Sequence, residues 1–149
     1  MKPIFPLIIL VLISVNLFSQ GKPVEDSCCY VGKQFILPIY FEVGSNELNN
    51  LNKTVLEDLS KSIQEYRWKI EIGVHADERL NETYKSKDTC TTCKRAEVIK
   101  GYLVSLGIEP NRIIAKGYQG RNPRFRNAIT EEEHQQNRRT VVTILSRNE

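Results

Sequence analysis

Two stretches of the chain carry hydrophobic residues three or four positions apart, and they alternate with stretches in which every second residue is hydrophobic. The first spacing covers residues 48–63 and 96–106 and is typical of amphipathic helices. The second covers residues 34–41 and 68–75 and, with the shorter stretches 112–117 and 140–145, predicts four strands. Helices that alternate with strands must bury their hydrophobic sides on one sheet. We therefore expect an α+β fold, a two-layer α/β sandwich in the order β-α-β-α-β-loop-β, with a four-stranded mixed sheet and two main helices.

Single residues indicate where these elements end and which sides they bury. Pro38 has no amide hydrogen, so the first strand should lie at an edge of the sheet or be distorted there. Gly107 is the expected C-terminal cap of the second helix. The side of the first helix expected to face the sheet consists of Leu48, Leu51, Val55, Leu59 and Ile63.

The first twenty residues have the composition of a secretory signal peptide. Lys2 precedes an apolar run, and a polar break follows Gln20, where cleavage is expected. The run contains Pro6 and is shorter than the roughly 20 residues that span a bilayer, so cleavage is favoured over a retained anchor. The predicted divisions are a signal peptide at 1–20, an N-terminal segment at 21–34 and a folded domain at 35–147. Export is therefore predicted, with no membrane span after cleavage.

The charge balance argues against a nucleic-acid partner. The 149 residues include 21 Lys plus Arg and 18 Asp plus Glu, for a net charge of +3. Domains that bind nucleic acids usually concentrate a strong positive field on one face. The sequence also contains no Ser/His/Asp set, Walker loop or dinucleotide fingerprint, so a binding protein without a cofactor is expected rather than an enzyme.

Asp77 and Arg95 are the most informative pair of polar residues. Asp77 follows the second predicted strand, and Arg95 lies at the start of the second helix, where a β-α unit brings the two ends close together. A carboxylate and a guanidinium in such a place suit a zwitterion, because Asp77 can accept an ammonium group and Arg95 can make a two-pronged contact with a carboxylate. A surface salt bridge worth roughly 0 to 1 kcal/mol is the alternative, and spacing alone favours it.

An ordered set of short motifs adds a family resemblance. From about residue 35 to residue 145 the chain resembles the OmpA-like peptidoglycan-binding domain family (the OmpA C-terminal and Pal type). The motifs are Phe41 with Ser45-Asn46, residues 70–77, Arg95-Ala96-Glu97-Val98, Tyr102-Leu103, Gly107-Ile108, Arg112-Ile113, Lys116-Gly117-Tyr118, Asn122-Pro123 and residues 137–141. The resemblance implies that Asp77 and Arg95 hold the diaminopimelate residue of the peptidoglycan stem peptide. It also implies a periplasmic location, at the cell wall or the inner face of the outer membrane, with an outer-membrane protein as a candidate partner.

The chain departs from the family pattern close to this site. Residues 78–81 replace a glycine-containing turn, and the segment that leads to Arg95 is about three residues longer than usual. Asp88 takes the place of a polar asparagine, so the resemblance adds it to the ligand-binding residues as a further negative charge. Gln119 replaces the second glycine of a Gly-Tyr-Gly motif. A protein-interaction module that kept the fold and lost peptidoglycan binding is therefore the rival interpretation.

Four cysteines suggest disulfide bonds, because exported proteins usually oxidise their thiols. They are Cys28, Cys29, Cys90 and Cys93. Links from the first pair to the second would tie the N-terminal segment to the loop before the second helix. A tetrahedral zinc site is the second possibility, and a redox-active C-x-x-C at a helix N-terminus is the third.

The remaining candidates are two histidines and several arginines. His75 is expected to face the sheet or its neighbouring layer, and His134 is expected to be solvated. Of Arg138 and Arg139, one is expected to be structural at the entry to the last strand and the other solvated. The basic loop with Arg121, Arg124 and Arg126 is expected to be solvated, with an anionic glycan as the alternative contact.

Overall fold

The computed structural model describes residues 30–80 and 90–147, and a four-stranded sheet lies at its centre. The strands are β1 (Gln34–Leu37), β2 (Trp68–His75), β3 (Ile113–Gln119) and β4 (Thr140–Arg147). Their order in the sheet is β1-β4-β2-β3, with β2 parallel to β3 and β4 antiparallel to both of its neighbours. This is the mixed sheet that the sequence predicts.

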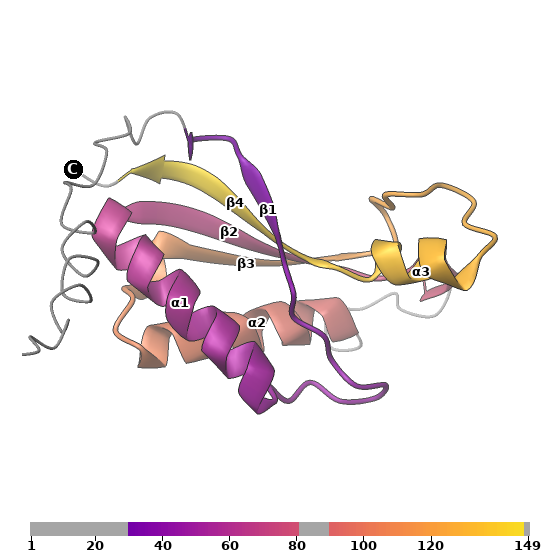
Figure 1. The fold of residues 1–149 in the computed structure, drawn as a ribbon, viewed down its shortest axis with the longest axis horizontal. Helices are drawn as coiled ribbons and strands as arrows, with labels where there is room; N and C mark the ends of the chain where they lie inside the picture. The colour runs from indigo at the N-terminus through magenta and orange to yellow at the C-terminus, as the bar shows by residue number, and fades with distance from the viewer. Residues whose placement is uncertain (1–29, 81–89, 148–149) are drawn as a thin grey trace, which may run out of the picture.

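Two long helices cover one face of the sheet. They are α1 (Asn50–Tyr66) and α2 (Thr91–Ser105), and Figure 1 shows both on the same side of the strands. Their inner sides and the facing strand residues form one core of fully buried aliphatic side chains, among them Leu56, Ile70, Ile72, Ile99 and Leu103. The α+β, two-layer prediction is therefore confirmed. None of the helices in the described ranges has the length and apolar character that a membrane span requires.

The buried side of α1 differs in part from the predicted one. The fully or nearly fully buried residues of α1 are Asn52, Leu56, Ser60 and Ile63, whereas Leu51 is 64% exposed. Four of the five predicted residues do contact the core, since Ile63 is fully buried and Leu48, Val55 and Leu59 pack against it partly buried. Leu51 is the exception, because the polar residues Asn52 and Ser60 take two of the most buried positions of the helix. Asn52 is 1% exposed, and its side chain accepts a hydrogen bond from the Tyr40 amide (3.3 Å) and donates one to the Tyr40 carbonyl (2.9 Å). The Tyr40 backbone thus supplies the hydrogen bonds that this buried side-chain amide needs, and the spacing of hydrophobic residues gives no sign of that contact.

The ends of the elements follow local backbone chemistry. β1 is an edge strand and ends at Leu37, directly before Pro38, as a residue without an amide hydrogen requires. Gly107 has φ +93° and follows the C-cap Leu106 of α2. The amides of Gly107 and Ile108 donate to the carbonyls of Val104 (2.9 Å) and Leu103 (3.2 Å), and these two hydrogen bonds form a Schellman cap. The expected cap is confirmed.

A short helix, α3 (Glu131–Asn137), occupies part of the stretch that the sequence suggests is a polar loop. Thr130 and Glu133 form a reciprocal capping box at its start. Figure 1 shows α3 apart from α1 and α2, beyond the end of the sheet where β2 finishes and β4 begins. Two 3-10 turns, η2 (Glu78–Leu80) and η4 (Pro110–Arg112), complete the described elements. The helix α3 is important because it brings charged side chains to the end of β2.

Candidate functional site

Asp77 lies two residues after the end of β2 and is 3% exposed. Backbone hydrogen bonds hold the strand end on both sides: the His75 amide donates to the Arg139 carbonyl (2.9 Å) and the Ala76 amide to the Gln119 carbonyl (2.8 Å). The Asp77 carboxylate is thus fixed at the carboxyl ends of two parallel strands. Ligand sites in sheets with helical crossovers are often found at such ends.

The Asp77 carboxylate is already bonded to Arg79. The Arg79 amide donates to Oδ1 (2.9 Å), and its Nε donates to Oδ2 (2.7 Å). Burial favours the neutral carboxyl group, but the hydrogen bonds and charge of Arg79 outweigh it, so the pKa of Asp77 lies below its ordinary value. The Arg79 side chain is 56% exposed. Arg79 is therefore the partner that can move away without disturbing buried packing.

Two further basic groups reach Asp77 from α3 and the residue that follows it. Arg138 Nη1 donates to Oδ2 (3.2 Å), and its Nη2 donates to Glu131 (2.6 Å) and Gln135 (2.5 Å). His134 Nδ1 lies 3.2 Å from the same Oδ2, but its direction falls outside hydrogen-bond geometry. The prediction that His134 is solvated is wrong, because α3 turns this side chain toward Asp77 and leaves it only 13% exposed.

Arg139 also has a structural position. Its guanidinium donates to the carbonyls of Asn137 (3.3 Å) and Asn122 (3.1 Å), and burial lowers its pKa from the ordinary value. Arg138 and Arg139 are both partly buried and both bonded. The expectation that one of them is simply solvated is therefore wrong, since the turn between α3 and β4 uses both side chains. Arg121, Arg124 and Arg126 are exposed, in line with a solvated loop.

The loop between β1 and α1 holds the Arg95 side chain near the start of α2. Its Nε and Nη2 donate to the Ser45 carbonyl (3.1 and 2.9 Å), and Nη2 also donates to the Glu42 carbonyl (3.0 Å). The guanidinium carbon lies 4.9 Å from the centre of the Phe41 ring, a cation–π distance. Burial lowers the pKa of Arg95 from its ordinary value. Nη1 is the end of this guanidinium that makes no hydrogen bond to any residue in the described ranges.

The start of α2 is tied to the strand ends next to Asp77. Gln119, at the end of β3, donates from its amide to Thr92 Oγ1 (3.2 Å), and its carbonyl accepts from Ala76 (2.8 Å). Asp77 and Arg95 therefore lie on elements that meet at one edge of the sheet. Within residues 30–80 and 90–147 no hydrogen bond or ion pair joins their two side chains. Asp88, the third predicted ligand-binding residue, lies outside the described residues.

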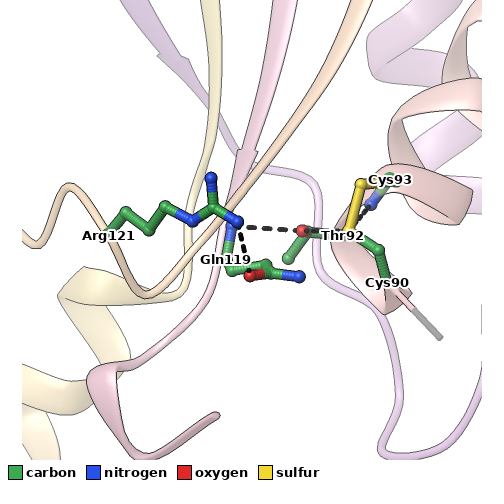
Figure 2. Close-up of a disulfide and its surroundings, with 5 residues drawn as sticks. All are labelled: Cys90, Thr92, Cys93, Gln119 and Arg121. Carbon is green, nitrogen blue, oxygen red and sulfur yellow. Dashed lines mark hydrogen bonds between the residues drawn. A yellow bond between two sulfur atoms is a disulfide. The ribbon is translucent and has the colours of Figure 1, made fainter. Parts of the chain in front are cut away.

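Cys90 and Cys93 are bonded to each other across the first turn of α2 (Figure 2), with their Cα atoms 5.2 Å apart. The prediction that Cys90 and Cys93 are bonded to Cys28 and Cys29 is therefore wrong. Cys90 and Cys93 bond to each other because a spacing of three residues at a helix start brings their sulfur atoms within reach. Cys28 and Cys29 themselves lie outside the described residues. No cluster of three or more His, Cys, Asp or Glu side chains suited to a metal occurs in the part of the chain that the structure describes.

The opposite face of the sheet carries a small polar pocket of about 180 Å³. His75 lies here, on the sheet face without helices, and its ring stacks on Tyr118 with 4.5 Å between centres. Tyr118 donates to Glu71 (2.6 Å). Burial and the positive charge of Arg139 lower the pKa of His75 to about 4. At neutral pH His75 is therefore an uncharged packing residue of this face.

Sequence reasoning identified Asp77 and missed its partners. Arg79 was noted only as a departure from a family turn, although a residue two positions after an aspartate can reach back to it. Glu131, His134 and Arg138 are spaced three and four residues apart, which is the spacing of one side of a helix. That spacing was the available signal for α3.

A family comparison decides the relationship of this chain to known proteins. The family model described as the OmpA family matches residues 40–138, about two thirds of the chain. The chain belongs to the OmpA family. The match includes Asp77 and Arg95 and most of the OmpA-like fold described above.

Solved structures of OmpA-like fold resemble this one. A MotB-like protein from Desulfovibrio vulgaris has a TM-score of 0.62 and 25% identity, over 73% of this chain and 70% of that chain. The cell wall anchor of the T6SS from Pseudomonas aeruginosa has a TM-score of 0.58 and 20% identity, over 70% and 73%. The peptidoglycan-associated lipoprotein from Burkholderia pseudomallei has a TM-score of 0.58 and 22% identity, over 70% of this chain and 86% of that chain. No curated protein sequence matches the chain.

Proposed function

We propose that this protein binds peptidoglycan non-covalently in the periplasm, through the diaminopimelate residue of the stem peptide. The observation that carries the proposal is the buried Asp77 carboxylate at the end of β2, with the first turn of α2 bonded beside it, in a domain of the OmpA family. The names of two structural neighbours, a cell wall anchor and a peptidoglycan-associated lipoprotein, support the same ligand class.

In this proposal the ligand's ammonium group binds Asp77. Both carboxylate oxygens are occupied by Arg79 in the free protein, so the ammonium must displace the exposed Arg79 side chain. Such an exchange replaces one charge-assisted hydrogen bond by another, so its net free energy is small. The affinity then depends on what the rest of the ligand contacts.

Arg95 binds the ligand's carboxylate through one nitrogen. Nε and Nη2 hold the Glu42 and Ser45 carbonyls, which leaves Nη1 for the ligand while the loop stays in place. A one-pronged contact is weaker and less directional than the two-pronged contact expected from the sequence. Asp88 contributes negative charge from the segment before α2.

Co-sedimentation with purified diaminopimelate-type peptidoglycan tests the proposal. The parent protein is expected in the pellet, and Asp77→Asn and Arg95→Ala are expected in the supernatant. Asp58→Asn and Lys94→Ala are the matched controls, since both side chains are exposed and neither contacts Asp77 or Arg95. Free diaminopimelate should compete, and Nα-acetyl-lysine amide, which has an ammonium group but no carboxylate, should compete poorly. A parent protein that stays in the supernatant would contradict the proposal.

The rival function is a protein-interaction module that has lost the ligand. One observation favours it: Asp77 and Arg95 already form most of their hydrogen bonds with other residues of the protein. In that case the parent and all four variants would remain in the supernatant. Capture of an outer-membrane protein by the parent would then identify the partner.

A further inference from the structure

The Cys90–Cys93 disulfide closes only the first turn of α2. A disulfide stabilises a fold mainly by restricting the unfolded chain, and the restriction grows with the length of the closed loop. Here the sequence separation is three residues, and both cysteines belong to the same helix start. The bond therefore adds little to the stability of the whole domain, and a role in holding the fold together does not account for it.

The two sulfur atoms lie in different surroundings. Cys90 is 2% exposed and is the N-cap of α2, whereas Cys93 is partly exposed. Access therefore differs between the two ends of the bond. An external thiolate reaches Cys93 more easily than Cys90.

Two donors point at the Cys90 sulfur, as Figure 2 shows. The Cys93 amide donates to it (3.2 Å), and Thr92 Oγ1 lies 3.4 Å away. A disulfide sulfur carries no hydrogen, so the Thr92 hydroxyl must be the donor. The same hydroxyl oxygen accepts from the Gln119 amide (3.2 Å), which fixes its hydrogen toward the sulfur. Thr92 is 3% exposed, so the arrangement is shielded from water.

This arrangement favours a thiolate at Cys90 when the bond opens. Helix N-termini and hydrogen-bond donors stabilise a thiolate, and a thiol with a lowered pKa is a better leaving group in thiol–disulfide exchange. The less buried residue of the pair and the stabilised sulfur are thus placed in the order that a directional exchange requires.

We propose that Cys90–Cys93 is a reducible pair that accepts two electrons from an external dithiol, with Cys93 as the attacked sulfur and Cys90 as the leaving thiolate. In the first step a thiolate of the dithiol forms a mixed disulfide with Cys93 as the Cys93–Cys90 bond breaks. In the second step the other thiol of the dithiol, as its thiolate, displaces Cys93. The dithiol becomes a disulfide, and Cys90 and Cys93 become thiols. This inference does not depend on peptidoglycan binding.

The test uses the full chain with Cys28→Ser and Cys29→Ser, so that only one disulfide is present. Brief exposure to the monothiol glutathione is followed by acid quenching and peptide mass spectrometry. The glutathione adduct is expected mainly on Cys93. An adduct mainly on Cys90, or no reaction in native protein, would overturn the proposal.

Thr92 provides the second measurement. Thr92→Val is expected to slow reduction by dithiothreitol roughly tenfold, because it removes a hydrogen bond to the developing charge. Thr92→Ser keeps the hydroxyl and should stay within about twofold of the parent. The thiol pKa is a further readout. When Cys93→Ser is added to the protein with Cys28→Ser and Cys29→Ser, the pKa of the remaining Cys90 thiol should lie below its ordinary value, and it should rise when Thr92→Val is added. Equal rates in Thr92→Val and Thr92→Ser proteins, with an unchanged Cys90 pKa, would contradict the assignment. The thiol pKa also keeps the test decisive if Thr92→Val alters stability.

Discussion

At the scale of single residues, the Asp77 carboxylate collects basic groups that are far apart in the chain. Arg79 is its near neighbour, while His134 and Arg138 lie about sixty residues further on. A buried carboxylate is stable only when charge and hydrogen bonds compensate for its lost hydration. The position of Asp77 could be predicted from the end of a strand pattern. Its partners could not, because they depend on where α3 packs.

Asp77→Asn is expected to lower the free energy of unfolding by about 1–3 kcal/mol at neutral pH, since it removes a charged acceptor from a buried site. Urea denaturation of parent and variant measures the difference, and Asp58→Asn should cost no more than about 0.5 kcal/mol. The pKa of Asp77 is lowered in the folded state, so its contribution is present above the unfolded pKa of about 3.8 and is lost as the pH falls through the lower folded pKa. A variant as stable as the parent at neutral pH would contradict this account.

His75 gives a pH dependence in a different range. Its pKa is about 4 in the folded protein and 6.5 in the unfolded chain, so below pH 6.5 the unfolded state takes up a proton that the folded state does not. The free energy of unfolding should fall between pH 6.5 and pH 4, by about 1–2 kcal/mol because solvent screens this partly exposed group, and this part of the fall should level off below pH 4. In His75→Phe protein, which keeps a ring against Tyr118, that slope should be absent. An equal slope in both proteins would show that another group is responsible.

At the scale of elements, strands were easier to predict than helix faces. β2 has the bounds that the alternation of hydrophobic residues predicts, because its two neighbours in the sheet together pair its full length. The predicted side of α1 packs on the core except for Leu51, but the sequence contained no sign that Asn52 and Ser60 are buried there as well, because their hydrogen bonds go to the carbonyls of Tyr40 and Glu57. The spacing of hydrophobic residues shows that a helix is amphipathic, but it does not show which polar residues are buried.

The contact between α2 and β3 can be tested at two glycines. A Cβ at Gly117 would lie 2.4 Å from the Cys93 amide nitrogen and 2.6 Å from its sulfur, so Gly117→Ala must move the start of α2 or the strand. We expect a loss of about 2–4 kcal/mol in the free energy of unfolding. Gly101→Ala, on α2 with nothing within 4 Å of the added atom, should instead raise stability by up to about 1 kcal/mol. Thermal denaturation of both variants distinguishes the results, and a neutral Gly117→Ala would mean that the contact is looser than the structure shows.

At the scale of the whole molecule, reduction of the disulfide should destabilise the domain modestly without unfolding it. A closed loop of four residues restricts the unfolded chain by about 2 kcal/mol at most in the chain-entropy model. In the Cys28→Ser, Cys29→Ser protein, reduction is expected to lower the urea midpoint only slightly and to leave the cooperativity of unfolding unchanged. A loss of folded structure on reduction would show that the start of α2 is required for the whole domain.

The arrangement of the sheet has a consequence for how the chain reaches its folded state. β4 is the last strand in the sequence, yet it lies between β1 and β2, which are made first. Until residues 140–147 are available, β1 has no hydrogen-bonded neighbour and β2 lacks its longest pairing. Pairing that joins distant parts of a chain is also slow to form. A partly synthesised chain would thus remain open, and this sheet would be completed only when β4 became available.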